Sequence, residues 1–325
     1  MNLAKYAIDN GGSIRPLIIP SELTGGTGLM NPSVFVENDK ISLILRHVNY
    51  TFYHSEKKLF QHYWGPLTYV HPEDDMHLRT TNYYCELDDD CNLVKYSKID
   101  TSKFDTYEPL WDFVGLEDAR LFKWDGQLYT CGVRRDLDTI GTARMELCGI
   151  DVKENSVVET SRFRIPAPGK NDTYCEKNWM PILDKPFHFV KWTNPTEVVK
   201  VDPVNKTCQT IELSNEVYEL QRDLRGGSQV VRIGNFYVAC THEVIFFDSK
   251  VGRKDAIYLH RFVVWDDNFS IVRLSKEFSF MGGDVEFCAG MSKHRDDILL
   301  TFGFQDNASY IIRIPTKVLE DFFNE

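Results

Sequence analysis

The chain has 325 residues, of which 13% are aromatic, and its formal net charge is −11. The length leaves room for one large core or two smaller domains, and the aromatic content excludes a disordered chain and favours a β-rich or carbohydrate-handling protein. The negative charge argues against a nucleic-acid partner, because binding to phosphate backbones needs a positive surface. A small anionic ligand is compatible with basic residues that gather locally.

The cysteine pattern and the terminal residues bear on compartment and cofactors. The eight cysteines form no Cys-x-x-Cys pair, and no Cys/His run has the spacing of a zinc site. The N-terminal residues lack the apolar core of a signal peptide, and no apolar run reaches the length of a transmembrane helix. These features predict a cytoplasmic protein without a membrane span, a metal or another cofactor.

After an irregular lead-in over residues 1–29, one pattern recurs five times. Each unit has a polar turn, an apolar strand and a polar strand end. The five apolar strands are expected at residues 41–46, 128–133, 187–192, 236–241 and 298–304. Helical periodicity is nearly absent, except over residues 316–324, where it predicts a short C-terminal helix.

The number of units predicts the architecture. Five units in 325 residues leave roughly 65 residues for each, enough for a four-stranded sheet with its loops. We therefore expect an all-β fold, a five-bladed β-propeller that forms a single domain over residues 1–325. A two-domain β-sandwich is the alternative.

The stretch Gly115-Leu-Glu-Asp-Ala-Arg-Leu121 is the most unusual one in the chain. Glu117, Asp118 and Arg120 lie among apolar residues, where charged groups need a partner or a wet cavity. A strand, an Asp-Gly turn and a second strand follow directly. The stretch alone fits a buried ion pair that fixes a turn and a functional site equally well.

Other polar residues follow or precede the expected inner strands. In a propeller the inner strands surround one channel, so residues distant in sequence meet at one face. Taken alone, Asn31 fits a turn asparagine better than a site residue, and Arg46 and Asn49 fit a solvated loop, although the many hydrogen-bonding groups there add some weight to a site. Arg225 precedes two glycines that fit a tight turn, and His242 fits a structural histidine.

Three further positions carry candidate groups. Lys177 and Asn178 precede an apolar strand, which is an unusual position for a charge unless it serves a site. The carboxylates of Glu286 and Asp306 could bind sugar hydroxyls. Because no Ser/His/Asp order or nucleophile elbow is present, a metal-free acid/base site fits best.

Six short motifs, spread in order over nearly the whole chain, resemble glycoside hydrolase family 130. That family consists of five-bladed propellers and includes mannoside phosphorylases and some β-mannosidases, and a related group of β-1,2-mannosyltransferases shares the fold. The motifs are Met30-Asn-Pro-Ser-Val34, Gly115–Leu121, Glu176-Lys-Asn-Trp-Met-Pro181, Arg225-Gly-Gly227, Glu286-Phe-Cys-Ala-Gly290 and Phe302-Gly-Phe-Gln-Asp306. The family usually has Pro where this chain has Ala119.

The resemblance implies roles for individual residues. Asp118 would be the catalytic acid, and Asn31 and Asp306 would hold the sugar. Lys177, together with arginines and a histidine, would hold an attacking phosphate. The remaining candidates for the anion are His242, Arg225 and one of Arg134, Arg135 or Arg144, with Arg134 preferred. Those for the substrate are Arg46, Asn49, Glu117, Arg120, Asn178 and Glu286.

The chemistry can be argued from the residues as well. Inverting transfer needs an acid on one face of the sugar and a nucleophile held on the other. One catalytic Asp with basic residues favours phosphorolysis or transfer from a sugar phosphate, because phosphate needs only cations to hold it. In a hydrolase, Glu117 or Glu286 could act as the base.

Two other functions stay open at this stage. One is a glycosyltransferase that uses an activated nucleotide sugar to build surface glycans, and the other is a non-catalytic glycan-binding propeller. The expected partners are an oligosaccharide or sugar phosphate and inorganic phosphate, and a homo-oligomer is compatible with the sequence.

Overall fold

The structure is a computed structural model that describes residues 1–52, 69–70, 75, 77–169, 173–248 and 254–324. Most of its strands, all except β4, β5 and β8, fall into five antiparallel meanders of four strands each. Apart from short helices, these residues are organised by strands, so the all-β prediction is confirmed. Within this part of the chain, no helix is both long and apolar enough to cross a membrane.

The meanders follow one another along the chain, except that the last one also includes a strand that precedes the first meander. The first has β2 (Leu29–Glu37), β3 (Lys40–Val48), β6 (Leu78–Leu87) and β7 (Leu93–Asp100), and the second β9 (Glu117–Trp124), β10 (Gln127–Arg134), β11 (Arg144–Val152) and β12 (Val157–Arg164). The third has β13 (Met180–Pro181), β14 (His188–Trp192), β15 (Glu197–Asp202) and β16 (Thr207–Leu213), and the fourth β17 (Val231–Ile233), β18 (Phe236–Asp248), β19 (Lys254–Trp265) and β20 (Ile271–Leu274). The fifth has β21 (Glu286–His294), β22 (Asp297–Phe304), β23 (Ala308–Pro315) and β1 (Ser13–Pro16).

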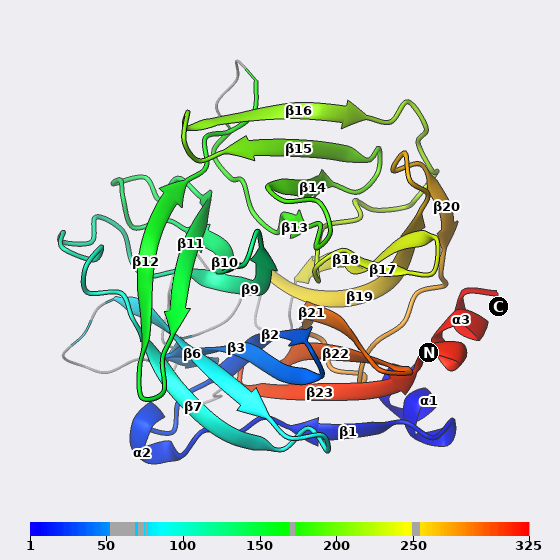
Figure 1. The fold of residues 1–325 in the computed structure, drawn as a ribbon, viewed down its shortest axis with the longest axis horizontal. Coiled ribbons are helices and arrows are strands. Elements are labelled where there is room, and N and C mark those ends of the chain that lie inside the picture. The colour runs from blue at the N-terminus through cyan, green and yellow to red at the C-terminus, as the bar shows by residue number, and fades with distance from the viewer. Residues whose placement is uncertain (53–68, 71–74, 76, 170–172, 249–253, 325) are drawn as a thin grey trace.

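The meanders are grouped around a common centre (Figure 1). Their first strands meet there: β2 contacts β9 and β21, and β21 also contacts β17. The remaining short elements are β4 (Thr51–Phe52), which pairs with β5 (Tyr69–Val70), β8 (Phe113–Val114), which pairs with β6, and the helix α2 (Ser21–Thr24).

The first and second meanders are joined into one sheet. A short parallel pairing of β7 with β12 gives the strand order β2-β3-β6-β7-β12-β11-β10-β9. The two ends of this sheet approach each other, because Leu121 N in β9 donates a 3.1 Å hydrogen bond to Ser33 Oγ in β2. The eight-stranded sheet is therefore nearly closed, and the division into five separate blades stays a prediction.

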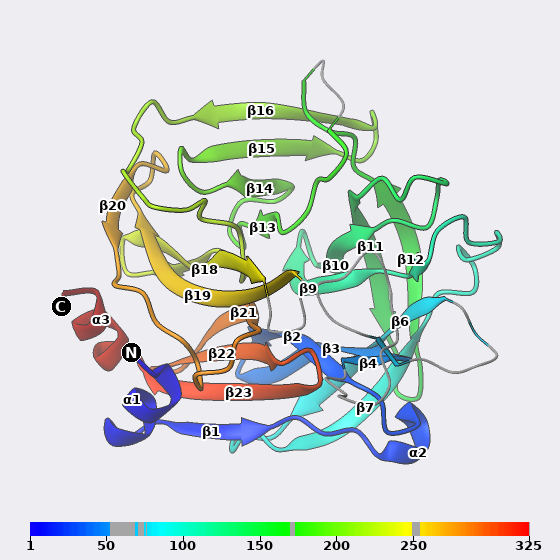
Figure 2. The same cartoon turned by 180° about the vertical axis from the view of Figure 1, so that it is seen from behind.

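The prediction of an irregular lead-in over residues 1–29 is wrong. Helix α1 (Leu3–Asp9) is capped by Asn2, whose side chain accepts a 2.9 Å hydrogen bond from Lys5 N, and it buries an apolar face. Strand β1 then pairs antiparallel with β23, beside which it lies in both ribbon views (Figures 1 and 2). The start of the chain thus completes the fifth meander, next to the predicted C-terminal helix, which is present as α3 (Thr316–Asn324).

One buried side chain links three of the meanders at the centre. The Gln229 amide nitrogen lies 2.7–3.0 Å from Ser33 Oγ, Val34 O and Leu121 O, and the Gln229 amide oxygen accepts a 2.9 Å hydrogen bond from Met291 N. Since Gln229 itself is fully buried, these bonds satisfy polar groups that would otherwise be costly. They hold β2, β9 and β21 around the segment before β17.

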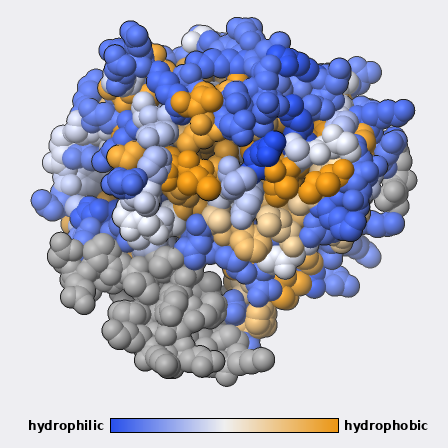
Figure 3. Space-filling view, turned by 90° about the horizontal axis from the view of Figure 1, so that it is seen from below, coloured by the Kyte–Doolittle hydropathy of each residue, from blue (hydrophilic) through white to orange (hydrophobic). Residues whose placement is uncertain are grey.

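The face of the molecule that carries β1 and β7 has both hydrophilic and hydrophobic regions (Figure 3). Figure 3 views the molecule from the side on which β1 and β7 lie in Figure 1, and shows a mainly hydrophilic edge with hydrophobic residues nearer the middle. Ile18, Val94 and Tyr96 are among the exposed hydrophobic side chains in or beside these strands. The homo-oligomer stays a prediction.

Candidate active site

A pocket of about 190 Å³ collects most of the predicted site residues. Side chains from or next to strands of all five meanders line it. The predicted residues among them are Asn31, Arg46, Glu117, Asp118, Lys177, Asn178, Arg225, His242 and Asp306. Because these residues are far apart in sequence, their convergence supports the reasoning that strand ends meet at one site.

The backbone is unusual at four of the lining positions. Asn31, Asp118, Asn178 and Asp306 have φ values of 47°, 49°, 60° and 48°, in the left-handed region that non-glycine residues rarely adopt. Strand pairing also shifts its register beside Asn31 and opposite Asp118. Such strain clusters at functional sites, where it directs side chains that a regular strand would point elsewhere.

Asp118 is held by two donors from the first meander. Its Oδ1 accepts a 2.7 Å hydrogen bond from Arg46 Nη1 and a 2.8 Å hydrogen bond from Asn31 Nδ2. Burial favours the neutral acid, but the Arg46 charge and the Asn31 amide outweigh it and hold the pKa of Asp118 below its usual value. Asp118 is therefore an ionised carboxylate at neutral pH.

Arg46 is the central cation of this side of the pocket. It is buried, and besides Asp118 it contacts Glu117 Oε2 at 3.4 Å, Tyr50 Oη at 3.3 Å and Thr80 Oγ1 at 3.1 Å. A guanidinium bonded on several sides has little freedom to move, so it fixes the two carboxylates of β9 relative to β3.

Asp306 has the opposite environment. It follows β22 in the turn before β23, and no described residue donates a hydrogen bond to its carboxyl group. Burial, together with the negative charges of Asp118 and Glu117, raises its pKa to about 7, although Arg46 acts in the other direction. Two carboxyl groups of one pocket thus differ strongly in their tendency to hold a proton.

Cationic groups line the same pocket. Lys177 and Arg225 supply the charges, and His242 lies beside them, its ring stacked on Tyr258 with centroids 5.5 Å apart. Burial lowers the pKa of His242 well below its usual value, and His260, Arg225 and Lys177 add to the effect. His242 is therefore a neutral hydrogen-bonding group, while Lys177 and Arg225 are the groups suited to an anion.

A second pocket, of about 250 Å³, adjoins the first one. Lys177, Asn178 and Arg225 line both of them, and Lys191 and Trp192 line only the second. The three shared residues therefore lie between two spaces, as residues that contact two parts of one substrate would.

The structure corrects the prediction that Arg120 contacts the substrate. Its side chain is fully buried and lines neither pocket. Arg120 Nε donates to Gly227 O at 2.9 Å and Nη1 donates to Asp118 O at 2.6 Å, and the guanidinium lies over the Phe287 ring. Arg120 supports the pocket from behind.

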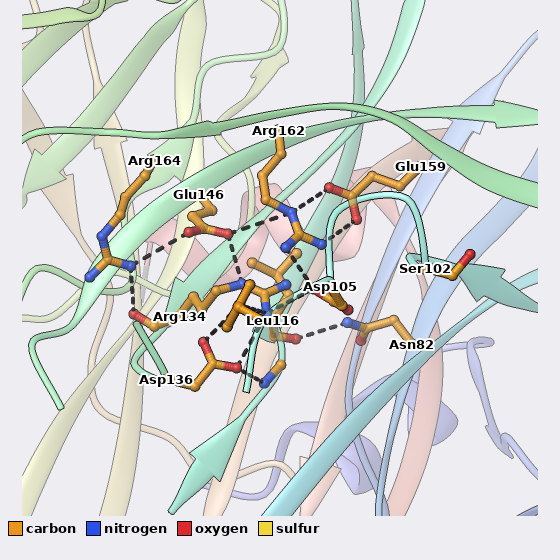
Figure 4. Close-up of polar contacts among 12 residues, drawn as sticks. Asn82, Ser102, Asp105, Leu116, Arg134, Asp136, Glu146, Glu159, Arg162 and Arg164 are labelled. Atoms are coloured by element: carbon orange, nitrogen blue, oxygen red, sulfur yellow. Dashed lines mark hydrogen bonds and ion pairs between the residues drawn. The ribbon is translucent and has the colours of Figure 1, made fainter. Parts of the chain in front are cut away.

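Arg134 was expected at the anion and lies in a separate ion-pair network instead. Its Nε donates to Glu146 Oε2 at 2.8 Å, and Nη1 lies 3.3 Å from Asp136 Oδ2. Figure 4 shows it enclosed by these carboxylates and by those of Asp105, with Arg162 beside Glu146. Because its donors are engaged there and it does not line the central pocket, Arg134 is not placed to bind the anion.

Asn49 and Glu286 are also placed elsewhere. Asn49 joins the end of β3 to the start of β6, since its Oδ1 accepts from Arg79 N at 2.7 Å and its Nδ2 donates to His77 O at 3.0 Å. The fully buried Glu286 carboxylate accepts hydrogen bonds from three backbone N–H groups, those of Phe280, Met281 and Gly283. Both residues shape loops, and neither lines the pocket.

Sequence reasoning missed the aromatic wall of the pocket. Tyr50, Phe113, Tyr258 and Phe287 all line it. Tyr50 lies four residues after Arg46 in a polar stretch, which is a usable signal, whereas Tyr258 and Phe287 sit in apolar strands where they resemble ordinary core residues. Aromatic faces beside polar groups are suited to a sugar ring, which has both kinds of surface.

Comparison with solved structures identifies the fold. No protein-family model matches the sequence, and a search of curated proteins finds no match. Many solved structures nevertheless match with high probability. The chain has the fold of glycoside hydrolase family 130, as the resemblance of the six motifs implies.

Three of these structures show how far the similarity extends. A structure from work on family 130 glycoside hydrolases that target β-1,2-mannosidic linkages in Candida mannan has a TM-score of 0.60 at 12% identity and covers 90% of this chain and 85% of the other. The β-1,2-mannobiose phosphorylase of Listeria innocua, in complex with β-1,2-mannobiose, has a TM-score of 0.56 at 12% identity, and the match covers 96% of this chain and 97% of the other. MPT-4, a mannose phosphorylase of Leishmania mexicana in complex with phosphate, has a TM-score of 0.53 at 12% identity, and the match covers 97% of this chain and 92% of the other.

Proposed function

We propose that the protein is a carbohydrate-active enzyme on a five-bladed β-propeller that cleaves or forms a β-mannoside-like bond with inversion, by phosphorolysis or by its reversal from a sugar phosphate. The observation that carries the proposal is the presence of three carboxyl groups, the cationic groups of Lys177 and Arg225, and four aromatic rings around one pocket. The carboxyl groups serve proton transfer and sugar binding, and the cations serve an anionic nucleophile.

Phosphorolysis accounts for the cations better than hydrolysis does. A hydrolase needs a carboxylate that activates water, whereas phosphate is already nucleophilic and needs to be held and neutralised. If water attacks instead, there is no anion to hold, and Lys177 and Arg225 would have no role in binding the nucleophile. The solved structures of similar fold include phosphorylases, one of them in complex with phosphate, which supports the same reading.

Hydrolysis is the second candidate because Glu117 also lines the pocket. Its Oε2 contacts Arg46 at 3.4 Å, while Oε1 is buried and has no hydrogen-bond partner in the part of the chain that the structure describes, where Arg135 Nε lies 3.8 Å away. A carboxylate oxygen with so few partners could activate water. One of the structures of similar fold comes from work on glycoside hydrolases of family 130. None of the three structures named above is described as a glycosyltransferase.

One experiment separates the two candidates. The purified protein is incubated with β-1,2-mannobiose with and without inorganic phosphate, and the products are analysed for mannose 1-phosphate and free mannose. Phosphorolysis gives mannose 1-phosphate only when phosphate is present, and hydrolysis gives mannose in both cases. If neither product forms from a panel of β-mannosides, and mannose 1-phosphate with mannose yields no disaccharide, the proposed function is wrong.

A further inference from the structure

We propose that a pocket between the first and second meanders is a further binding site, and that its ligand is a neutral carbohydrate. This pocket, which we call the side pocket, has a volume of about 380 Å³, compared with about 190 Å³ for the central pocket. Sites for small molecules commonly have volumes of about 300–1,000 Å³. The residues that line the side pocket include Thr80, Asn82, Thr130, Arg134 and Ile150. The inference does not rest on the proposed function.

The side pocket is separate from the candidate active site. No described residue lines both the side pocket and the central pocket. One stretch of chain divides them, because Gly115 and Leu116 line the side pocket, whereas the next two residues, Glu117 and Asp118, line the central pocket. A ligand in the side pocket therefore lies outside the space in which the reaction is proposed to occur.

The joint between the two meanders encloses the side pocket. Val157 of β12 pairs in parallel with Ile99 of β7, and the inner strands are linked by the hydrogen bond from Leu121 N to Ser33 Oγ. Between these two connections the meanders face each other, and they share one apolar cluster. Side chains from β6, β7, β10, β11 and β12 line the space that this cluster does not fill.

The two facing surfaces both change from apolar to polar along their strands. Alternate residues of a strand share a face, so Leu128, Thr130 and Arg134 lie on one face of β10, and Tyr84 and Asn82 lie on one face of β6. Tyr84 belongs to the apolar cluster and Leu128 packs against it. The other three residues line the side pocket. Packed side chains therefore fill the apolar end, and the side pocket occupies the polar end.

The charged groups around the side pocket are already paired with one another (Figure 4). Arg134 Nε donates to Glu146 Oε2 at 2.8 Å, and Arg162 donates to Glu159 Oε1 at 2.7 Å and to Asp105 Oδ1 at 2.6 Å. Arg134, Glu146 and Glu159 are buried. A charged ligand would compete for one partner of such a pair and leave the other uncompensated, which is costly for a buried charge. A neutral ligand leaves the pairs intact.

Uncharged hydrogen-bonding groups are available to such a ligand. Asn82 Nδ2 donates a 2.8 Å hydrogen bond to Leu116 O, while Asn82 Oδ1 is buried and has no hydrogen-bond partner among the described residues. A buried acceptor without a donor lowers stability, and a ligand hydroxyl group can supply the donor. Thr81 and Thr130 also line the side pocket, and a threonine hydroxyl group can both donate and accept.

Apolar side chains complete the lining, among them Ile99, Val114 and Ile150. A sugar ring has both kinds of surface, because its hydroxyl groups lie at the edge and its C–H groups form apolar faces. The exposed residues Lys98 and Glu108 also line the side pocket, so it is open to solvent. A neutral carbohydrate therefore fits the lining and has a route of entry.

Methyl NMR of protein labelled at isoleucine and valine can locate the ligand. Ile99 and Ile150 report on the side pocket, and Val285 reports on the central pocket. Titration with mannose should shift the signals of Ile99 and Ile150 in a saturable manner, whether or not the protein turns over any glycoside. The absence of such shifts, or shifts confined to Val285, would overturn the proposal.

Two variants test the contacts. Thr130→Val and Asn82→Leu each keep the approximate shape of the side chain but remove its polar groups, so each should raise the dissociation constant for mannose by about 3- to 10-fold. Thr193→Val is the matched control, since Thr193 is fully buried but lines none of the three pockets, and it should leave the dissociation constant unchanged. The other isoleucine signals check that each variant is folded. Unchanged dissociation constants in both test variants would overturn the site.

Charged sugars test the class of ligand. Mannose 1-phosphate and mannosamine should each shift the Ile99 and Ile150 signals with a dissociation constant at least about 10-fold higher than that of mannose, because the buried charges are already paired. Binding of either charged sugar at this site as tightly as mannose would contradict a neutral ligand.

Discussion

Arg120 Nε donates a 2.9 Å hydrogen bond to the carbonyl oxygen of Gly227, and this bond joins the second meander to the turn that precedes the fourth. A second bond runs from Arg120 Nη1 to Asp118 O at 2.6 Å. One buried guanidinium thus fixes the backbone of a pocket residue against a distant part of the chain. Gly227 also lies against the backbone of β18, where only a glycine fits, because a Cβ there would lie 2.2 Å from Cys240 O.

Replacement of Arg120 should therefore cost stability. Arg120→Met keeps most of the side-chain volume but leaves two buried carbonyl oxygens without their donor, so we expect a loss of about 3 kcal/mol in the free energy of unfolding, measured by urea denaturation. Arg232→Met is the control, because Arg232 is exposed, and its ion pairs with Asp184 and Asp267 and its contact with the Tyr237 ring contribute about 0–1 kcal/mol each. Equal effects of the two changes would contradict the supporting role of Arg120.

Removal of the Arg46 charge should shift the acidic side of the activity profile. Arg46 holds the pKa of Asp118 down, so Arg46→Gln should raise that pKa and move the acid limb of kcat/KM to higher pH. Arg46→Lys keeps the charge but loses the fork of donors, and should shift the limb less. The pH dependence of kcat/KM for both variants checks this, and an unchanged acid limb in Arg46→Gln would show that Asp118 does not set it.

The anion-binding role of Lys177 has a kinetic consequence. Lys177→Met should raise the KM for phosphate by about 10- to 100-fold, because a hydrogen bond to a charged group contributes about 1.5–3 kcal/mol. Lys123→Met is a suitable control, since the Lys123 ammonium is paired with Glu37 at 2.7 Å and lines neither of the two pockets that Lys177 lines. A phosphate KM that stays the same in Lys177→Met would remove Lys177 from the anion site.

Stability should fall in mild acid because of a buried histidine. His260 is fully buried beside Phe278 and Phe280, neither ring nitrogen has a hydrogen-bond partner among the described residues, and burial lowers its pKa from 6.5 to about 3. Below pH 6.5 the unfolded chain binds a proton at this position that the folded chain does not, so the free energy of unfolding decreases as pH falls towards 3.

The variant His260→Phe isolates this effect. Below pH 6.5, its free energy of unfolding should decrease less steeply with falling pH than that of the wild type, by about 1.4 kcal/mol per pH unit. Above neutral pH, the free energies of the two proteins should change with pH in the same way. Urea denaturation at a series of pH values measures the slope, which does not depend on how well Phe packs at this position. Parallel slopes in the two proteins would show that another group causes the acid sensitivity.

The local pattern of turns and strands was sufficient to predict most of the fold. Strands β3, β10, β14, β18 and β22 and helix α3 occur where the apolar runs and turn residues predict them. The pairing of β1 with β23 and the joint of β7 with β12 were not predictable in this way. Both depend on partners distant in sequence, and the four residues of β1 carry no alternating pattern of their own.

The sequence was also sufficient to predict part of the candidate site. Residues near strand ends, such as Asn31 at the start of β2 and Asp306 just after β22, meet in the pocket, because residues in or next to strands of all five meanders converge there. Glu286 begins an inner strand as well, yet it turns to the backbone N–H groups of the preceding loop. Sequence alone does not say whether a carboxylate at such a position faces a ligand or its own main chain.

The position of β1 sets an order for folding of the newly made chain. Strand β1 ends at Pro16, yet its strand partner among the described residues is β23, which begins at Ala308, so most of this sequence lies between the two. A contact between segments so distant in sequence forms late and carries a large entropic cost. The fifth meander can therefore be completed only after β23 has been synthesised, which places its completion after synthesis of the other four meanders.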